Sequence, residues 1–311
     1  DLKKDPLLYQ LSCFALGGND DLCINPNVSR SVARRFIFLQ TLPIISTLLG
    51  ILLLLYQGWL LLRRKKFQWP LLSSIPLTLI DMIILIAGGF VILGEVVFPA
   101  FIIPISSSLI QGLESPVNEA VKVFVGYISM TLPPIFILRK QLNGLKGFEI
   151  PPLGWLQWKI QPLGSAFLSA LQGWLMIMPF VLLTGWLSNV FIGDQGGSNP
   201  LLELVLGSHS PLALGLLLTT TIILAPFFEE LIFRGALLPV LGKRLGRFGG
   251  VIVSAFIFGL AHLSVGELPA LFVLGIGLGV LRISSGRLLP CALMHSLWNG
   301  VTFANLLLLG A

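Results

Sequence analysis

The stretch TTTIILAPFFEELIFR, residues 219–234, decides the fold, because two adjacent carboxylates and an arginine interrupt a strongly apolar run. Glu230 and Arg234 are four residues apart, so a helix places them on one face, where they can pair. Glu229 then points about 100° away and has no partner in its own helix. A charge at the centre of a membrane helix costs roughly 2.5–3.5 kcal/mol, so we expect a function for Glu229. For Glu230 and Arg234 the alternative is a buried pair that orients helices.

Pro226 lies three residues before Glu229. Proline has no backbone N–H, so it interrupts the helical hydrogen-bond ladder and frees a carbonyl group one turn earlier. Within a membrane such a break is tolerated where the backbone is buried in protein or lines a cavity. The break at Pro226 therefore indicates that the backbone beside Glu229 is either buried in protein or lines a cavity.

The composition predicts a membrane protein. Charged residues make up 11% of the 311 residues and hydrophobic ones 55%, with a mean hydropathy of +0.91, whereas a soluble domain carries about 25% charged residues. A membrane span needs about 20 mostly apolar residues. The segments that qualify or come near are 36–62, 76–103, 121–138, 163–193, 211–241, 251–264, 268–283 and 288–310. We predict an all-α membrane protein with about eight transmembrane helices around a polar intramembrane cavity.

The loops after the odd-numbered segments carry the basic residues. Their Lys and Arg residues are Arg63, Arg64, Lys65, Lys66, Arg139, Lys140, Lys146, Lys159, Lys243, Arg244, Arg247, Arg282 and Arg287, thirteen in all. The even loops, 104–120, 194–210 and 265–267, contain none. By the positive-inside rule the odd loops face the cytoplasm, or the stroma or matrix of an organelle, and both termini lie on the other side. Three arginines that precede the first segment, Arg30, Arg34 and Arg35, argue against this orientation.

Two of the three histidines lie in later apolar segments. His262 follows Phe258 by four residues, and His295 precedes Asn299 by four, so each pair shares a helix face. At 1.5 Å per residue, Glu229, His262 and His295 lie roughly 18, 17 and 10 Å from the basic loops. The three side chains can therefore meet inside the membrane. The alternative for each histidine is a hydrogen-bonded core residue, and His209 in a polar loop is expected to be ordinary.

Other intramembrane protease chemistries lack their motifs here. The sequence has no His-Glu-x-x-His zinc motif, no Gly-x-Ser-Gly of the rhomboid kind and no Gly-x-Gly-Asp of the aspartyl kind. Gly275, Gly277 and Gly279 follow no strand, so they do not predict a nucleotide loop. The Gly275 and Gly279 pair is instead typical of closely approaching membrane helices.

Three motifs in this order, Glu229-Glu230-x-x-x-Arg234, Phe258-x-x-x-His262 and His295-x-x-x-Asn299, resemble the CAAX-protease and bacteriocin-processing family of intramembrane endopeptidases. This family is also called the Abi family, and its eukaryotic branch includes the type II CAAX prenyl endopeptidase. The motif region spans about residues 211–305.

The resemblance implies an endopeptidase with its site in the bilayer. Glu229 and His262 would hold and activate a water, with Glu229 as the general base. His295 and Asn299 would hydrogen-bond the oxyanion that forms on the scissile carbonyl. The remaining motif residues would support the site; they are Glu230, Arg234 and Phe258.

The resemblance leaves the metal question open, since members have been described as metalloproteases and as metal-independent glutamate enzymes. In the zinc alternative Glu229, His262 and His295 are the ligands, with an open position for water. We favour a reaction without a metal or another cofactor, because Asn299 is a poor zinc ligand and a good donor to an oxyanion.

The chain divides into three expected parts. Residues 1–35 form an N-terminal extramembrane segment, 36–162 three accessory transmembrane helices, and 163–311 the catalytic transmembrane domain. Cys13 and Cys23 are ten residues apart in the first part, on the side where disulfides persist, so we predict a disulfide between them. The chain begins at Asp1 rather than Met, which leaves an upstream segment, a signal included, open.

The expected location is a bacterial cytoplasmic membrane or an organellar one, a plastid or thylakoid membrane included, with the site opening toward the basic loops. The expected partners are the lipid bilayer and a protein or peptide substrate at the membrane. Nucleic acid is not expected, because the basic residues form no single patch.

Two other classes of function remain open. The first is a non-catalytic scaffold or a bacteriocin-immunity type of module. The second is a proton-coupled transporter, for which Asp81 and Glu95 would be needed within the second segment. Against a transporter, the sequence has no matching pair of broken helices in two halves.

Overall fold

The computed structural model describes residues 26–63, 69–70, 72, 74–110, 112–193 and 200–310. The predicted disulfide between Cys13 and Cys23 lies outside these residues. The helices of the described part are α3 (Pro26–Leu62), α4 (Leu79–Ile83), η1 (Ile84–Val97), α5 (Phe98–Leu109), α6 (Val117–Asn143), α7 (Leu163–Ile192), α8 (Pro200–Leu206), α9 (Pro211–Leu218), η2 (Thr219–Leu224), α10 (Ala225–Glu230), η3 (Leu231–Leu237), α11 (Leu238–Leu260), α12 (Leu268–Ser285) and α13 (Leu289–Gly310). The elements marked η are π-helical stretches within longer helices.

Within the described residues, seven helical segments are long and apolar enough to cross a membrane. One of them, Pro211–Leu260, has 50 residues and would be about 75 Å long if it were straight, more than twice the hydrocarbon thickness of about 30 Å. It is not straight, because Gly246 has a non-helical conformation at φ 72° and ψ 162°. The segment therefore folds back as a hairpin and supplies two crossings, which agrees with the predicted eight.

Glycine lets the two arms of this hairpin close. A Cβ atom on Gly250 would lie 2.8 Å from the backbone of Gly242, closer than atoms pack. Further along, the Ser254 hydroxyl donates to the Phe233 carbonyl oxygen at 3.2 Å. The second arm of α11 thus runs back along η3, toward the carboxylates of α10.

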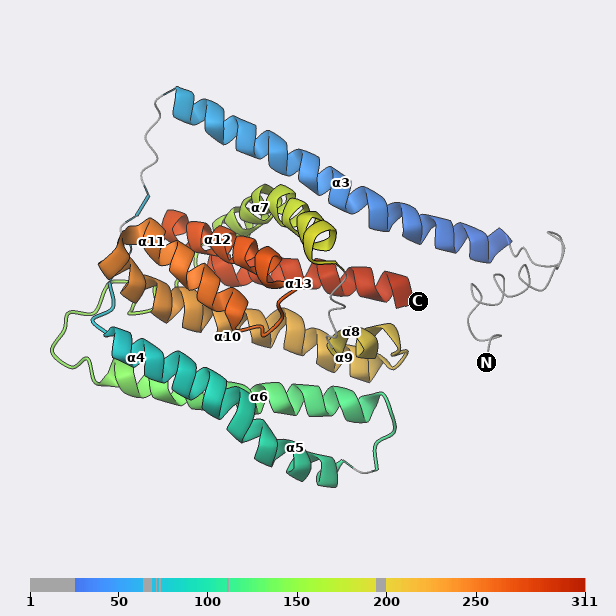
Figure 1. Ribbon diagram of the computed structural model, residues 1–311, viewed down its shortest axis with the longest axis horizontal. Coiled ribbons are helices and arrows are strands. Elements are labelled where there is room, and N and C mark those ends of the chain that lie inside the picture. Colours follow the sequence, from blue (N-terminus) through green and yellow to red (C-terminus); the bar gives the residue numbers. More distant parts are fainter. Residues whose placement is uncertain are drawn as a thin grey trace.

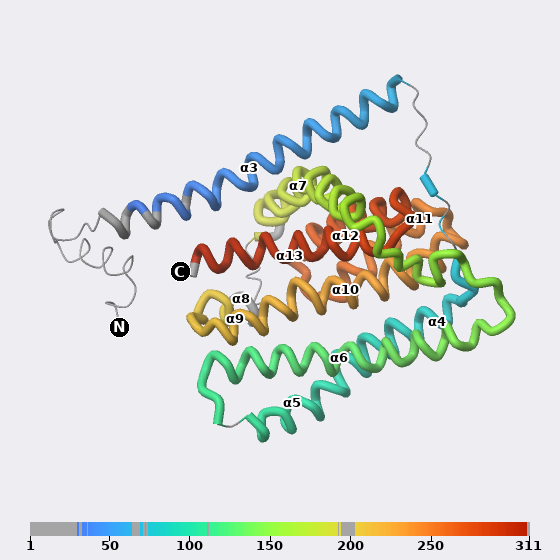
Figure 2. Tube along the Cα trace, turned by 180° about the vertical axis from the view of Figure 1, so that it is seen from behind, coloured from blue at the N-terminus to red at the C-terminus, as the bar shows by residue number. Residues whose placement is uncertain are grey.

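The connections gather at two ends of the molecule (Figures 1 and 2). One end, called the basic end here, holds the α3–α4 and α6–α7 connections and the bend of α11. The opposite end holds the α5–α6 connection, α8 and the end of α13. The predicted alternation of basic and non-basic loops is therefore confirmed as an arrangement in space. Which side of the membrane each end faces stays a prediction.

Arg282 corrects one detail of the loop assignment. Helix α12 continues to Ser285, so Arg282 lies inside it and is fully buried. It is therefore not a loop residue and does not bear on the topology. At the other terminus, α3 begins at Pro26, within the segment predicted to lie before the first span.

Helices α11 and α12 pack closely against each other, and the connection 261–267 between them stays partly exposed. Cβ atoms on Gly275 and Gly279 would lie 3.0 Å from Ala255 and 2.8 Å from Val251, so this pair makes the predicted close helix approach. Figure 1 shows the α11–α12 connection well short of the opposite end. His262, at the start of this connection, is therefore held beside α10.

Candidate active site

Glu230 forms the buried half of the site. Its Oε1 accepts a hydrogen bond from Arg234 Nη1 at 2.7 Å, and both residues are 0% exposed. The Nδ1 atom of His295 lies 3.0 Å from the same oxygen. The predicted pairing of Glu230 and Arg234 is confirmed, and Glu230 also contacts the Nδ1 edge of the His295 ring.

Arg234 is fixed by two further contacts. Its Nη2 donates to the Gly275 carbonyl oxygen at 3.2 Å, and its guanidinium lies over the Phe258 ring at 4.3 Å. Phe258 also contacts the rings of His262 and His295, at centroid distances of 4.7 and 5.7 Å. Phe258 thus packs among three of the polar site residues and sets their spacing.

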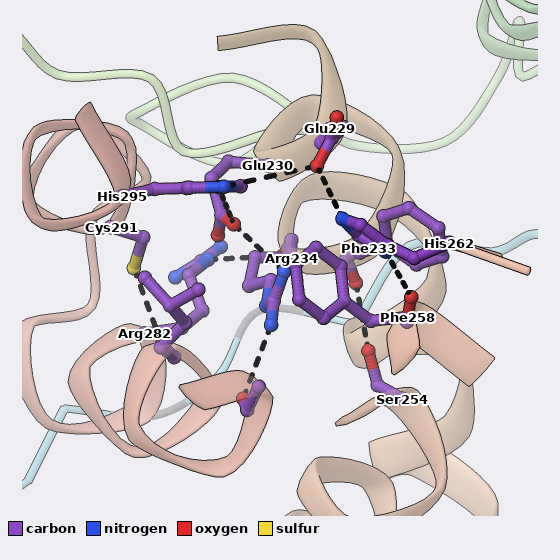
Figure 3. A network of polar contacts seen from close by, with 12 residues as sticks. Glu229, Glu230, Phe233, Arg234, Ser254, Phe258, His262, Arg282, Cys291 and His295 are labelled. Atoms are coloured by element: carbon purple, nitrogen blue, oxygen red, sulfur yellow. Dashed lines mark hydrogen bonds and ion pairs between the residues drawn. The ribbon is translucent and has the colours of Figure 1, made fainter. Parts of the chain in front are cut away.

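Glu229 forms the accessible half of the site (Figure 3). Its Oε2 lies 3.8 Å from Nε2 of His262 and 3.8 Å from Nε2 of His295. The side chains of His262, Glu229 and His295 are 29%, 13% and 4% exposed. The predicted meeting of these three side chains is confirmed. Both separations are too long for a direct hydrogen bond and fit a single bridging water molecule.

The partners of the two Nδ1 atoms fix the orientation of the histidine rings. His262 Nδ1 lies 2.8 Å from the Phe258 carbonyl oxygen, which can only accept, so this nitrogen carries the hydrogen. His295 Nδ1 lies beside the Glu230 carboxylate that Arg234 pairs with, so it also donates. In both rings the nitrogen that faces Glu229 is Nε2.

Asn299 is held by a carbonyl group that the proline break leaves free. In the π-helical stretch η2 the Ala225 N–H donates to Thr220 five residues back. The next donor would be Pro226, which has none, and the Thr221 carbonyl oxygen instead accepts from Asn299 Nδ2 at 2.8 Å. The second amide hydrogen of Asn299 is not used by this bond.

Tyr127 on α6 is a site residue that the motifs did not predict. Its hydroxyl donates to Glu229 Oε1 at 3.2 Å, which leaves Oε2 facing the histidines. Its ring packs edge-on against Phe228 at 6.3 Å. A tyrosine in an apolar helix carries no motif, so only the fold reveals this contact.

Arg282 and Gln157 are two further residues that sequence reasoning missed. Arg282 Nε donates to the Arg234 carbonyl oxygen at 3.2 Å, and its Nη2 donates to Gln157 Oε1. Gln157 belongs to the α6–α7 connection, so a loop at the basic end braces the buried half of the site. In the sequence, Arg282 was interpreted as a basic loop residue that indicates topology, and its contacts with the active-site helices were not predicted.

A groove between η1, α5 and α6 leads away from Tyr127. It has a volume of about 460 Å³ and is lined by Glu95, Pro99, Ile103, Lys122, Val123, Gly126, Tyr127 and Met130. Glu95, one of the two acidic residues that a transporter would need, is among these lining residues. The groove runs from Tyr127 toward the α5–α6 connection, which lies at the opposite end, away from the basic loops where an opening was predicted.

Asp81, one of the two acidic residues that a transporter would need, has a structural role. Its side chain and that of Thr78 form a capping box at the start of α4, with Thr78 N and Asp81 Oδ2 at 2.7 Å. The described contacts of Asp81 therefore give no support to an ion path through it.

Glu229 Oε2 and the Nε2 atoms of His262 and His295 are too far apart to be ligands of one zinc ion. A carboxylate and two imidazoles suit zinc chemically. With metal–ligand distances of about 2.0–2.1 Å, however, tetrahedral ligand atoms lie roughly 3.3–3.4 Å apart, less than the 3.8 Å seen here. No group of three or more His, Cys, Asp or Glu residues in the described part of the chain has the spacing of a metal site.

Two family models match the chain. One, described as type II CAAX prenyl endopeptidase Rce1-like, matches residues 211–301. The other, described as a domain of unknown function (DUF8675), matches residues 1–34. No curated protein and no solved structure matches the chain.

The first match covers the hairpin, α12 and most of α13. It includes all the predicted site residues, from Glu229 to Asn299, and supports an intramembrane protease activity in general. The resemblance seen in the three motifs is thereby confirmed for this region. Residues 211–301 of this chain are therefore similar to the family described as type II CAAX prenyl endopeptidase Rce1-like.

Proposed function

We propose that this chain is an intramembrane endopeptidase in which Glu229 activates the attacking water. The observation that carries this proposal is the position of Glu229 Oε2, 3.8 Å from one imidazole nitrogen on each side. A carboxylate that faces two histidines in a membrane interior is expensive to maintain, and the Glu230–Arg234 pair already accounts for helix orientation. A catalytic role explains the remaining charge.

The water would lie between Glu229 and His262. Both Glu229 Oε2 and the Nε2 atom of a neutral His262 are acceptors, and each can accept one hydrogen of the same water at a usual distance of about 2.8 Å. Its oxygen is then free to attack the scissile carbonyl carbon. Glu229 takes the proton and later returns it to the amide nitrogen, which leaves as an amine when the carbon–nitrogen bond breaks.

His295 and Asn299 would stabilise the oxyanion on the former carbonyl oxygen. His295 Nδ1 is committed to Glu230, so its Nε2 can donate only if the ring is an imidazolium. Asn299 would contribute its second amide hydrogen. Donors that are already in place when charge develops supply a large share of catalysis in acyl transfer.

The substrate would be a peptide segment at the membrane. An extended peptide segment would reach Glu229 through the groove beside Tyr127, which runs toward the opposite end of the molecule. The groove is lined mostly by apolar side chains, and Lys122 and Glu95 are its charged residues. No step is assigned to zinc, since the three candidate ligand atoms are too far apart as placed. The scaffold and transporter alternatives have no specific contact in their favour.

Cleavage by the purified full chain in liposomes tests this function. The probe is a library of peptides with a membrane anchor, and mass spectrometry identifies the products. We expect cut peptides whose new carboxyl group carries one oxygen from labelled water, at a rate that a zinc chelator leaves unchanged. Loss of activity with the chelator and its return with zinc would replace the glutamate mechanism by a metal one. The absence of cleavage across the library would favour the scaffold.

A further inference from the structure

A second cavity lies far from the carboxylates, between α3, α7 and α12. Its volume is about 530 Å³, within the usual range for ligand sites. Helix α3 approaches α7 closely at Gly50, where a Cβ atom would clash with the Leu175 carbonyl oxygen. From this crossing α3 diverges from the bundle toward the basic end (Figures 1 and 2). The cavity occupies the space that the divergence leaves.

The lining changes from polar to apolar with depth. Gln57 and Ser169 lie five and six residues from the basic-end termini of their helices, or about 8 and 9 Å. Trp69, in the α3–α4 connection, also lines the cavity, and tryptophan is typical of the lipid headgroup level. The deeper part is lined by Leu54, Met176, Ile177, Phe180 and Ile276. The change in polarity along the cavity matches that of a lipid molecule, which has a polar headgroup and apolar acyl chains.

Two carboxamides in the cavity have no protein partner. Neither Gln57 nor Gln172 makes a hydrogen bond to another described residue. Gln57 is half-buried and Gln172 is exposed, and both lie within apolar helices that are long enough to span the membrane, where lipid chains offer an amide no hydrogen-bond partner. Elsewhere within this membrane region Gln141 donates to the Asp81 carbonyl oxygen at 2.8 Å, which is how a glutamine is normally satisfied. The two unpaired amides therefore point to a polar group that the protein itself does not supply.

We propose that this cavity binds a membrane lipid from the leaflet at the basic end, with an uncharged headgroup that carries hydroxyl groups. Among the described residues that line the cavity there is no Asp, Glu, Lys, Arg or His. A phosphate would be matched by arginine or lysine, whereas amides and hydroxyls match hydroxyl groups. The apolar floor then accommodates the acyl chain. This site does not depend on the protease activity proposed above.

Native mass spectrometry of the delipidated full chain in detergent tests the proposal. The probe is a monohexosyl diacylglycerol, and the competitor is a phosphatidylglycerol with the same acyl chains. We expect one hexosyl lipid per chain, with at least tenfold less retained by the Gln57→Leu/Gln172→Leu double variant. Gln40→Leu is the matched control, because Gln40 is an exposed glutamine on the same helix, and we expect it to bind like the wild type.

Ser169→Phe provides an independent variant, since it fills the cavity and leaves both amides in place. We expect it to lose the lipid as well, with an unfolding temperature in detergent close to that of the wild type. Equal retention by the double variant and Gln40→Leu would overturn the site. Equal or stronger binding of phosphatidylglycerol would overturn the assignment of an uncharged headgroup, and binding of neither lipid would overturn the proposal.

Discussion

Two adjacent glutamates have different surroundings because their side chains leave α10 in different directions. Glu230 is fully buried between Arg234 and His295, so its charge is matched and its position is fixed. Glu229 keeps partial exposure, accepts one hydrogen bond from Tyr127 and faces two ring nitrogens. In the account proposed here Glu230 orients the site and Glu229 reacts.

Tyr127→Phe tests whether the hydroxyl positions the base. The variant keeps the ring that packs on Phe228 but loses the hydrogen bond to Glu229. A hydrogen bond to a charged group contributes about 1.5–3 kcal/mol, so we expect kcat to fall about tenfold or more with KM nearly unchanged. Tyr56→Phe is the control, since Tyr56 is exposed on α3. A higher KM with an unchanged kcat would argue against a positioning role.

Asn299→Ala tests the oxyanion donor. Loss of one such donor costs roughly 10²–10³ in rate, so residual cleavage is expected. His295→Ala should behave similarly if both residues are donors. Because Asn299 also pairs with the Thr221 carbonyl oxygen, the thermal stability of the purified variant is measured alongside its kinetics. Full wild-type turnover by Asn299→Ala would remove it from the site.

At the scale of elements, the hairpin within Pro211–Leu260 brings the motifs together. Its bend at Gly246 and its closure at Gly250 allow α11 to return along η3, which places His262 beside Glu229. The close α11–α12 packing holds the partly exposed His262 beside α10. The geometry of the site therefore depends on the close approach of these helix backbones as well as on the side chains of the site.

Gly250→Ala tests this dependence. The added methyl group would meet the Gly242 backbone at 2.8 Å, and backbone atoms cannot turn aside as a side chain can. Overpacking of this kind costs about 1–3 kcal/mol, so we expect a lower unfolding temperature and weaker cleavage. Gly185→Ala is the matched control, because no atom lies within 4 Å of a Cβ there and alanine favours a helix. Equal stability of the two variants would contradict the packing argument.

The sequence predicted the helices and the motif residues better than their surroundings. Apolar length located the spans, and four-residue spacing located the pairing of Glu230 with Arg234, because both depend on local periodicity. The π-helical stretches and the Thr221–Asn299 bond were not predicted, although Pro226 indicated that some carbonyl group would be free. Tyr127 and Arg282 were missed or misassigned because their roles depend on helices far away in the sequence.

At the scale of the whole molecule, basic connections lie at one end and the groove beside Tyr127 leads toward the other. We propose that the basic end faces the cytoplasm of a bacterium or the stroma or matrix of an organelle, with both termini across the membrane. The division of the chain into an N-terminal segment, accessory helices and a catalytic domain stays a prediction. The contact of Tyr127 with Glu229 gives the accessory helices a direct part in the site.

Cysteine labelling tests this orientation. In a background with Cys13 and Cys23 changed to serine, a cysteine at position 244 lies at the basic end and one at position 112 at the opposite end. We expect an impermeant thiol reagent to label position 112 and spare position 244 in right-side-out membranes. Detergent should make both react, which controls for accessibility. The reverse pattern would invert the topology and leave the site geometry unchanged.

Glu229→Gln distinguishes a catalytic carboxylate at this position from a structural one. The amide keeps the shape of the side chain and can still bond to Tyr127, but it cannot take a proton from water. The measurement is the single-turnover cleavage rate of a membrane-anchored peptide in liposomes, with Glu203→Gln as the control because Glu203 is exposed on α8. The account predicts no detectable cleavage by Glu229→Gln, wild-type cleavage by Glu203→Gln and equal unfolding temperatures. Wild-type cleavage by Glu229→Gln would contradict it.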